Sequence, residues 1–319
     1  MTHHLVAGGG GFIGSHLADL LVARGDRVTI VDNFSTGRRS NIAQLAGEDR
    51  ATVVEHDITM PLPVSITGGH FDTVLDLASP ASPDDFKTMP LEILAVGSTG
   101  TRNLLDIALA QRARFFLAST SEVYGDPLVH PQPETYWGNV SSIGPRSCYD
   151  EAKRFSEALA MAYHRTKGLD IRIARIFNTY GERMRPRDGR VVNTFVLQAL
   201  RDEPLTLHGD GSQTRSFCHV ADEVVGLAAV IDGDHIGPIN VGNPVEFTMR
   251  ELAELVIELS GSASTITSVA LPPEREGDPL QRCPDISLAR SSYGWEPTIS
   301  LRDGLARMID WFRTKEELT

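Results

Sequence analysis

Residues 3–14 read HHLVAGGGGFIG, and this stretch decides the fold class. Its apolar start predicts a β-strand, its glycines a tight turn, and the amphipathic residues as far as Arg24 a helix. Glycines 8, 11 and 14 would let the backbone approach a pyrophosphate, and the helix N-terminus would offer free N–H groups to the phosphates. We therefore predict an α/β fold with a doubly wound parallel sheet of the Rossmann type, carrying a dinucleotide on this turn.

The next predicted strand, residues 27–31, runs into Asp32. A carboxylate at this position accepts hydrogen bonds from the adenosine ribose hydroxyls and repels a 2′-phosphate, which favours NAD over NADP. Arg38 and Arg39 follow closely, so the preference against NADP stays open at this point.

Strand-like runs then alternate with helical patterns, as expected for a parallel sheet with a smaller second domain. Runs at 52–55, 73–77, 114–118 and 171–176 alternate with helical patterns such as 91–111 and 149–167. After Asn178, prolines and arginines become frequent and the helices shorten. We predict an NAD-binding domain over 1–177, with 216–242 returning to it, and a smaller substrate domain formed by 178–215 and 243–319.

Composition excludes several classes of protein. The 319 residues carry a formal net charge of −12, which argues against a nucleic-acid partner. Cys148, Cys218 and Cys283 show no metal-ligand spacing, so we expect reduced thiols and no metal. No apolar run reaches about 18 residues and the first strand starts close to Met1, so we expect a cytoplasmic protein with no membrane contact.

A candidate redox site lies in the second half of the predicted sheet domain. Tyr149 precedes Lys153 by one helical turn, so both side chains share a face, and the ammonium would lower the phenol pKa from ~10 toward neutrality. Thr120, at the end of its strand, would supply a hydroxyl for the reacting oxygen. Such a Tyr–Lys pair occurs by chance on many helices, but the strand–turn–helix context favours catalysis.

These motifs resemble the extended short-chain dehydrogenases/reductases that act on nucleotide sugars. Longer strings, at 122–127 (EVYGDP), 136–140 (YWGNV) and 209–217 (GDGSQTRSF), resemble the UDP-glucuronate decarboxylases, also called UDP-xylose synthases. The resemblance implies NAD-dependent oxidation of UDP-glucuronate at C4, loss of CO2 from the 4-keto acid, and return of the hydride to give UDP-xylose.

The resemblance also implies the site residues. The catalytic set is Thr120, Glu122, Tyr149 and Lys153. The cofactor positions are Gly8, Gly11, Phe12, Ile13, Gly14, Asp32, Asn33, Asp57, Ile58, Leu77, Tyr149 and Lys153, and the substrate positions are Ser79, Asn178, Arg190, Arg215 and Arg282.

Four positions distinguish the chain from its relatives, and one of them is Asp76, which stands before Leu77 where a histidine is common and which we expect to lie outside the redox core. In the related dTDP-glucose 4,6-dehydratases an aspartic acid occupies position 121 and protonates a leaving hydroxyl, whereas here Ser121 is a poor acid. Ala95 stands where the family often has a lysine, and His208 where a tyrosine is usual. Both changes bear on substrate choice more than on the reaction type.

Several alternatives stay open. The chain could be another nucleotide-sugar 4-epimerase or dehydratase, a decarboxylase that releases the 4-keto pentose, or a cofactor-binding sensor that has lost its chemistry. The complete set of Thr120, Tyr149 and Lys153 argues against the sensor. The resemblance further implies a homodimer, in which the helices over 91–111 and 149–167 form a four-helix bundle across a two-fold axis.

Overall fold

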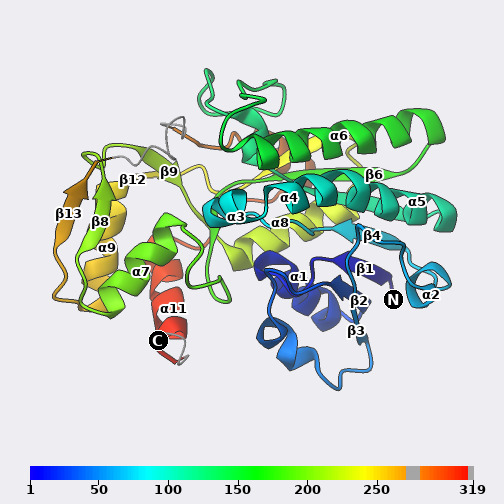
Figure 1. The fold of residues 1–319 in the computed structure, drawn as a ribbon, viewed down its shortest axis with the longest axis horizontal. Helices are drawn as coiled ribbons and strands as arrows, with labels where there is room; N and C mark the ends of the chain where they lie inside the picture. The colour runs from blue at the N-terminus through cyan, green and yellow to red at the C-terminus, as the bar shows by residue number, and fades with distance from the viewer. Residues whose placement is uncertain (271–280, 315–319) are drawn as a thin grey trace.

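The computed structural model describes residues 1–270 and 281–314, and at its centre lies a seven-stranded parallel sheet (Figure 1). The strand order is β11-β6-β5-β4-β1-β2-β3, so the chain reverses direction of winding between β1 and β4. The strands are β1 (His3–Ala7), β2 (Arg27–Asp32), β3 (Ala51–Glu55), β4 (Thr73–Asp76), β5 (Arg114–Thr120), β6 (Ile171–Ile176) and β11 (Pro238–Val241). The predicted doubly wound sheet is confirmed, and its ligand crevice is expected where the winding reverses.

Helices cover both faces of this sheet. Helices α1 (Phe12–Ala23) and α8 (Val220–Asp232) cover one face, and α5 (Thr101–Gln111) and α6 (Ser147–Lys167) cover the other. Within β1 the side chains alternate between the two cores: Val6 packs with α1 and α8, whereas Leu5 packs with α5 and α6. A strand buried on both faces explains why its sequence is continuously apolar.

A separate core lies beside the sheet, at the left of Figure 1. Helices α7 (Val191–Leu200), α9 (Met249–Ser260) and α11 (Leu301–Thr314) pack there next to the paired strands β8 (Leu205–His208) and β13 (Ile266–Val269). In sequence, α8 and β11 lie between the elements of this second core. In space they belong to the central sheet, where β11 pairs with β6. The exact domain limits stay a prediction.

Short elements connect these parts. They are η1 (Arg39–Leu45), α2 (Val64–Thr67), α3 (Pro83–Thr88), α4 (Pro90–Ala95), η2 (Val96–Gly100), η3 (Ser121–Tyr124), β7 (Thr179–Tyr180), β9 (Thr214–Ser216), β10 (Cys218–His219), β12 (Glu246–Thr248) and α10 (Ser287–Tyr293). No helix within the described ranges has the length and apolar character needed to cross a membrane. The compartment stays a prediction.

The helix predicted over 91–111 is interrupted in the structure. It consists of α4, the π-helical turn η2 and α5. At Gly97 in η2, an added Cβ would lie 2.8 Å from the Cβ of Ala152 on α6. The turn therefore brings the backbone of this helix directly against α6, an approach that only glycine permits.

Gly97→Ala should destabilise the protein by about 1–3 kcal/mol, because the added methyl group overlaps α6. In an unconstrained helix the same exchange stabilises by about 0.5–1 kcal/mol, so the sign of the effect identifies the contact. Urea unfolding gives the free-energy change, with the exposed Thr99→Ala in the same turn as control. An unchanged or higher stability of Gly97→Ala would contradict this packing.

Candidate active site

The glycine turn leaves no space for side chains. Gly8 has φ +79°, and a Cβ there would lie 2.7 Å from the backbone of Leu77 and Ala78 after β4. At Gly14 a Cβ would lie 2.2 Å from the carbonyl oxygen of Gly8. The N-cap of α1 is Gly11, which makes no side-chain capping bond, so the helix N-terminus is suited to an anionic ligand.

A cleft runs along the carboxyl ends of the central strands. It consists of two adjoining cavities that share Gly8, Gly11, Thr36, Leu77 and Ser79. The first cavity also contains Phe12, Ile13, Gly14, Thr120, Glu122, Tyr149, Lys153, Asn178 and Arg190, and the second contains Asp32, Asn33, Asp57 and Ile58. All the predicted cofactor positions therefore line this cleft.

Asp32, at the end of β2, faces the glycine turn. Its carboxylate accepts hydrogen bonds of 2.8 Å from the backbone N–H groups of Gly10 and Phe34. Burial raises the pKa of Asp32, and these two hydrogen bonds oppose the shift. Asn33 donates to Asp57 across the same cavity (3.1 Å), which links the ends of β2 and β3.

Thr120, Tyr149 and Lys153 meet in the first cavity, where all three are buried. Burial raises the pKa of Tyr149 to about 12; the charge of Glu122 adds to this shift and a hydrogen bond with Thr120 opposes it. The predicted lowering of this pKa is therefore wrong for the chain alone. Lys153 instead donates through Nζ to the Ala118 carbonyl oxygen at 2.9 Å.

Sequence reasoning missed Asp76 as a partner of this set. Asp76 ends β4, is 1% exposed and accepts a hydrogen bond of 2.8 Å from the Thr101 hydroxyl. Burial raises the pKa of Asp76, against the charge of Lys153. Burial lowers the pKa of Lys153, against Asp76 and Glu157. The buried ammonium is thus stabilised by a buried carboxylate that follows no recognised motif.

Two residues predicted for different roles form an ion pair. Glu122 of η3 binds the guanidinium of Arg282 through both oxygens, with Arg282 Nη2 at 2.9 Å from Oε2, and binds Arg146 Nη2 at 2.6 Å. Burial alone would raise the pKa of Glu122, but the two arginines outweigh it and hold the pKa well below the ordinary range. Glu122 is therefore an ionised carboxylate at neutral pH, and sequence reasoning missed Arg146.

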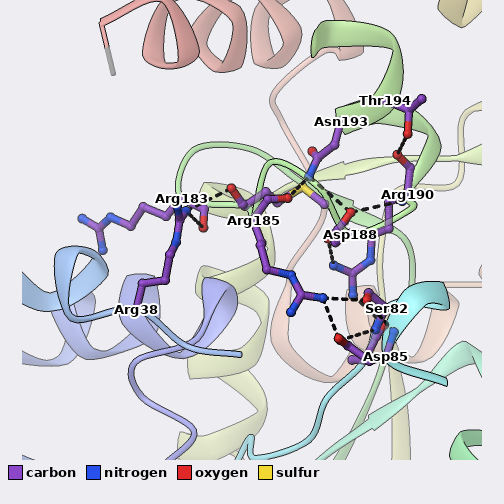
Figure 2. A network of polar contacts seen from close by, with 11 residues as sticks. Arg38, Ser82, Asp85, Arg183, Arg185, Asp188, Arg190, Asn193 and Thr194 are labelled. Atoms are coloured by element: carbon purple, nitrogen blue, oxygen red, sulfur yellow. Dashed lines mark hydrogen bonds and ion pairs between the residues drawn. The ribbon is translucent and has the colours of Figure 1, made fainter. Parts of the chain in front are cut away.

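A third cavity adjoins the cleft and contains four of the predicted substrate positions. Asn178, Arg190, Arg215 and Arg282 line it, whereas Ser79 lies in the cofactor part of the cleft. Arg190 donates to Asp188 at 2.6 Å and to the Ala81 carbonyl oxygen at 2.7 Å (Figure 2).

The segment around Arg190 joins the two parts of the molecule. Arg185 donates to the Ser82 hydroxyl (2.8 Å) and to Asp85 (2.7 Å) in the loop before α3 and in α3 (Figure 2). Arg38 reaches the Met184 carbonyl oxygen (3.2 Å), and Arg39 pairs with Glu55. Arg38 and Arg39, which left the cofactor preference open in the sequence analysis, therefore both contact other parts of the chain.

The two departures from the family lie in different places. His208 lines the third cavity together with Arg215. Ala95 lines the second cavity near Asp32 and Asp57, so it belongs to the predicted cofactor part of the cleft and not to the substrate part. The expectation that Ala95 bears on a substrate contact therefore finds no support in its position.

One group of potential metal ligands lies outside the cleft. His130, Glu246 and Cys283 each place a ligand atom within 4.8 Å of the other two, although sequence spacing did not indicate it. His130 Nε2 and Glu246 Oε2 form a hydrogen bond of 2.9 Å, which explains their proximity without an ion.

Comparisons with known proteins show the family of the chain. The family model described as GDP-mannose 4,6 dehydratase matches residues 5–308. UDP-glucuronic acid decarboxylase 1 of Arabidopsis thaliana is 52% identical over 311 residues, which cover 98% of this chain and 70% of the relative. The chain belongs to the UDP-glucuronic acid decarboxylase family.

Solved structures of related enzymes share the whole fold. The UDP-glucuronic acid 4-epimerase of Bacillus cereus, in complex with UDP-glucuronic acid and NAD, is similar with a TM-score of 0.87 and 29% identity, over 98% of this chain and 99% of that one. The dTDP-glucose 4,6-dehydratase DesIV of Streptomyces venezuelae, with NAD and TYD bound, gives 0.88 and 30%, over 99% and 100%. The fold alone therefore does not distinguish epimerase, dehydratase and decarboxylase.

Replacing Arg282 by methionine should destabilise the protein by about 3–5 kcal/mol, because Glu122 loses one of two buried counter-charges. Urea unfolding of Arg282→Met, Glu122→Gln and the double variant gives the coupling energy, with the exposed pair Arg302–Glu258 as control. The folded pKa of Glu122 lies below the unfolded one, so its contribution is present above the unfolded pKa and is lost as the pH falls through the folded pKa. Additive single effects at pH 7 would contradict the ion pair.

Proposed function

We propose that this chain is an NAD-dependent UDP-glucuronate decarboxylase that forms UDP-xylose and CO2. The observation that carries the proposal is the catalytic set, Thr120, Tyr149 and Lys153 in one cleft, in a chain 52% identical to an enzyme named for this activity. NAD and UDP-glucuronic acid bound together in a structural neighbour at 29% identity support the same cofactor and substrate class.

The residues of the cleft fit NAD. The turn at Gly8 and Gly14 excludes every Cβ where a pyrophosphate would approach, and Asp32 offers carboxylate oxygens at the end of β2 for a ribose. Arg39 pairs with Glu55, whereas Arg38 lines the first cavity and donates to the Met184 carbonyl oxygen, so the proposed preference for NAD rests on Asp32. When bound, NAD supplies the hydride acceptor for C4 of the sugar and a positive charge beside the tyrosine.

Tyr149 is the proposed proton acceptor at the C4 hydroxyl. Its raised pKa keeps the phenol protonated in the chain alone, so a nearby cation is needed before it can act as a base at neutral pH. Lys153 lies one turn further along α6 on the same face, but the pKa of Tyr149 stays raised beside it, so the further positive charge would have to come from the bound cofactor. The Thr120 hydroxyl, hydrogen-bonded to Tyr149, completes the contact with the reacting oxygen.

Oxidation at C4 makes the C6 carboxylate a β-keto acid. Its departing electron pair is delocalised onto the C4 oxygen, where Thr120 and Tyr149 are placed to stabilise the negative charge. Loss of CO2 requires no acid on a leaving hydroxyl, and Ser121 indeed offers none. For the diphosphate and uronate groups we propose Asn178, Arg190, Arg215 and Arg282, because guanidinium groups bind such anions in a bidentate manner.

Two alternatives differ in their products. A 4-epimerase would return the hydride to the opposite face without losing carbon, and structural neighbours at 28% and 29% identity are named as such enzymes. The 52% identity to a decarboxylase favours CO2 loss over epimerisation. A decarboxylase that stops at the 4-keto pentose would release NADH, so the balance of NADH and pentose identifies it.

Incubation with UDP-glucuronate and NAD should give CO2 and UDP-xylose in equal amounts without accumulation of NADH. Tyr149→Phe should lower the rate by on the order of 10²-fold or more, because C4 oxidation loses its proton acceptor. Tyr163→Phe, on the same helix and bonded to Asp106, is the matched control and should stay fully active. Mass spectrometry of the sugar nucleotide decides: a hexuronate epimer without CO2 would refute the proposal.

A homodimer through α4, α5 and α6 also remains our proposal. Leu91 and Leu94 on α4 are 75% and 41% exposed, and Phe155 on α6 is 51% exposed, in helices that pack against each other. Exposed large apolar side chains on helices that pack against each other are consistent with an interface in this region.

Phe155→Glu should weaken this dimer, because it places a charge in an apolar contact. Light scattering at micromolar concentration should report a dimer for the unmodified protein and monomers for Phe155→Glu. Val225→Glu, at an exposed position of α8 on the other face of the sheet, is the control and should stay dimeric. A monomeric unmodified protein would contradict the proposal.

A further inference from the structure

The proposed reaction consumes one proton that the redox step does not supply. Tyr149 takes the proton of the C4 hydroxyl during oxidation and returns it to the C4 oxygen when the hydride returns. The C5–C6 bond breaks, its electron pair passes into the 4-keto group, and C5 then takes up a proton (R–CO2⁻ + H⁺ → R–H + CO2). A second proton source, renewed from solvent in each turnover, is therefore required.

A separate cavity adjoins Glu122, and none of the predicted cofactor positions lines it. It is lined by segments 125–126, 139–141 and 144–147, together with Glu122, Asp150 and Arg282. Ser141 at its edge is exposed, so the cavity reaches the surface. Glu122 lines both this cavity and the candidate substrate cleft, and it forms a charged wall with Arg146 and Arg282.

Asp150 faces this cavity from α6. It follows Tyr149 directly, and since successive helical residues are about 100° apart, Tyr149 lines the cleft while Asp150 lines the cavity behind it. Asp150 is 6% exposed, and its Oδ1 has no hydrogen-bond partner among the described residues. Arg282 Nε in the same wall also has none. A buried oxygen of this kind needs a proton or an exchangeable partner.

The charges around Asp150 favour its protonated form. Burial raises the pKa of Asp150, the charge of Glu122 adds to this, and Arg146 and Arg282 oppose it. Glu122 itself is held ionised by the same arginines. The charged or titratable groups facing Asp150 across the helix, the wall and the cavity are Glu122, Arg146, Arg282, Glu151, Tyr149 and Asp126.

We propose that this cavity is the proton-uptake route of the enzyme, in which Asp150 takes a proton from solvent and passes it through Glu122 to the substrate cleft. The inference rests on the proposed decarboxylation. Glu122 suits the transfer because a carboxyl group with a depressed pKa holds a proton only briefly and donates it readily. Asp150 does not touch the substrate in this proposal; it acts on the reaction only through Glu122.

Single-turnover experiments with NAD and UDP-glucuronate on Asp150→Asn separate the steps. Cofactor reduction and CO2 release should keep the unmodified rates, whereas UDP-xylose formation should slow about 10-fold or more, with NADH and the C4 enolate accumulating; acid quenching should convert this enolate to the 4-keto pentose. Asp150→Glu should restore the rate of UDP-xylose formation. Glu151 is the adjacent carboxylate, and Glu151→Gln should leave the rate of every step unchanged. The rate of UDP-xylose formation should fall as the pH rises through the pKa of Asp150. This pH dependence should be weaker in Asp150→Asn.

A second variant tests the route without touching the carboxylate. Ser141→Trp should obstruct the exposed edge of the cavity and produce the same accumulation of NADH and the C4 enolate. Unmodified UDP-xylose formation in both variants would overturn the proposal, as would an equal slowing of cofactor reduction, which indicates a structural role. Absence of CO2 with the unmodified protein would instead refute the proposed function.

Discussion

The buried pairing of Glu122 with Arg146 and Arg282 is the constraint on which the site depends. It joins the segment after β5, the start of α6 and the segment before α10, which are distant in sequence. Removing these charges from water costs several kcal/mol each, and the cost is offset only because two guanidinium groups contact one carboxylate. The start of α6, which carries Tyr149, is thereby held against the strand end that carries Thr120.

The same burial explains the electrostatics of the redox set. Tyr149 and Lys153 are enclosed, so burial disfavours both the tyrosinate and the ammonium, raising the pKa of the first and lowering that of the second. The charge of Asp76, at the end of β4, opposes this lowering of the Lys153 pKa. Tyr149, the base that we propose, therefore needs a further positive charge close to it, which the oxidised cofactor would supply.

Local sequence predicted most of the fold and part of the site. The glycine turn, Asp32 and the Tyr149–Lys153 pair are recognised from short spacings, because a turn or one helical face fixes their geometry. The pair of Glu122 with Arg282 joins residues 160 positions apart, and no spacing rule connects them. The direction of the Tyr149 pKa shift was also mispredicted, since burial depends on packing from several elements. The π-helical turn at Gly97 was not predicted for the same reason, because the close contact at this glycine is with Ala152 on another helix.

The chemistry of the family suggests where related enzymes on this scaffold should differ. Epimerase, dehydratase and decarboxylase share the sheet. In the decarboxylation proposed here, the proton and the hydride that are taken from C4 are both returned to it. What differs is the second event: water loss requires an acid at a leaving oxygen, whereas CO2 loss requires a proton at carbon. Ser121 removes the first possibility, and the charged wall of Glu122 with the cavity behind it is suited to the second. The decisive differences therefore lie around η3 and the start of α6, outside the dinucleotide motif by which the fold is recognised.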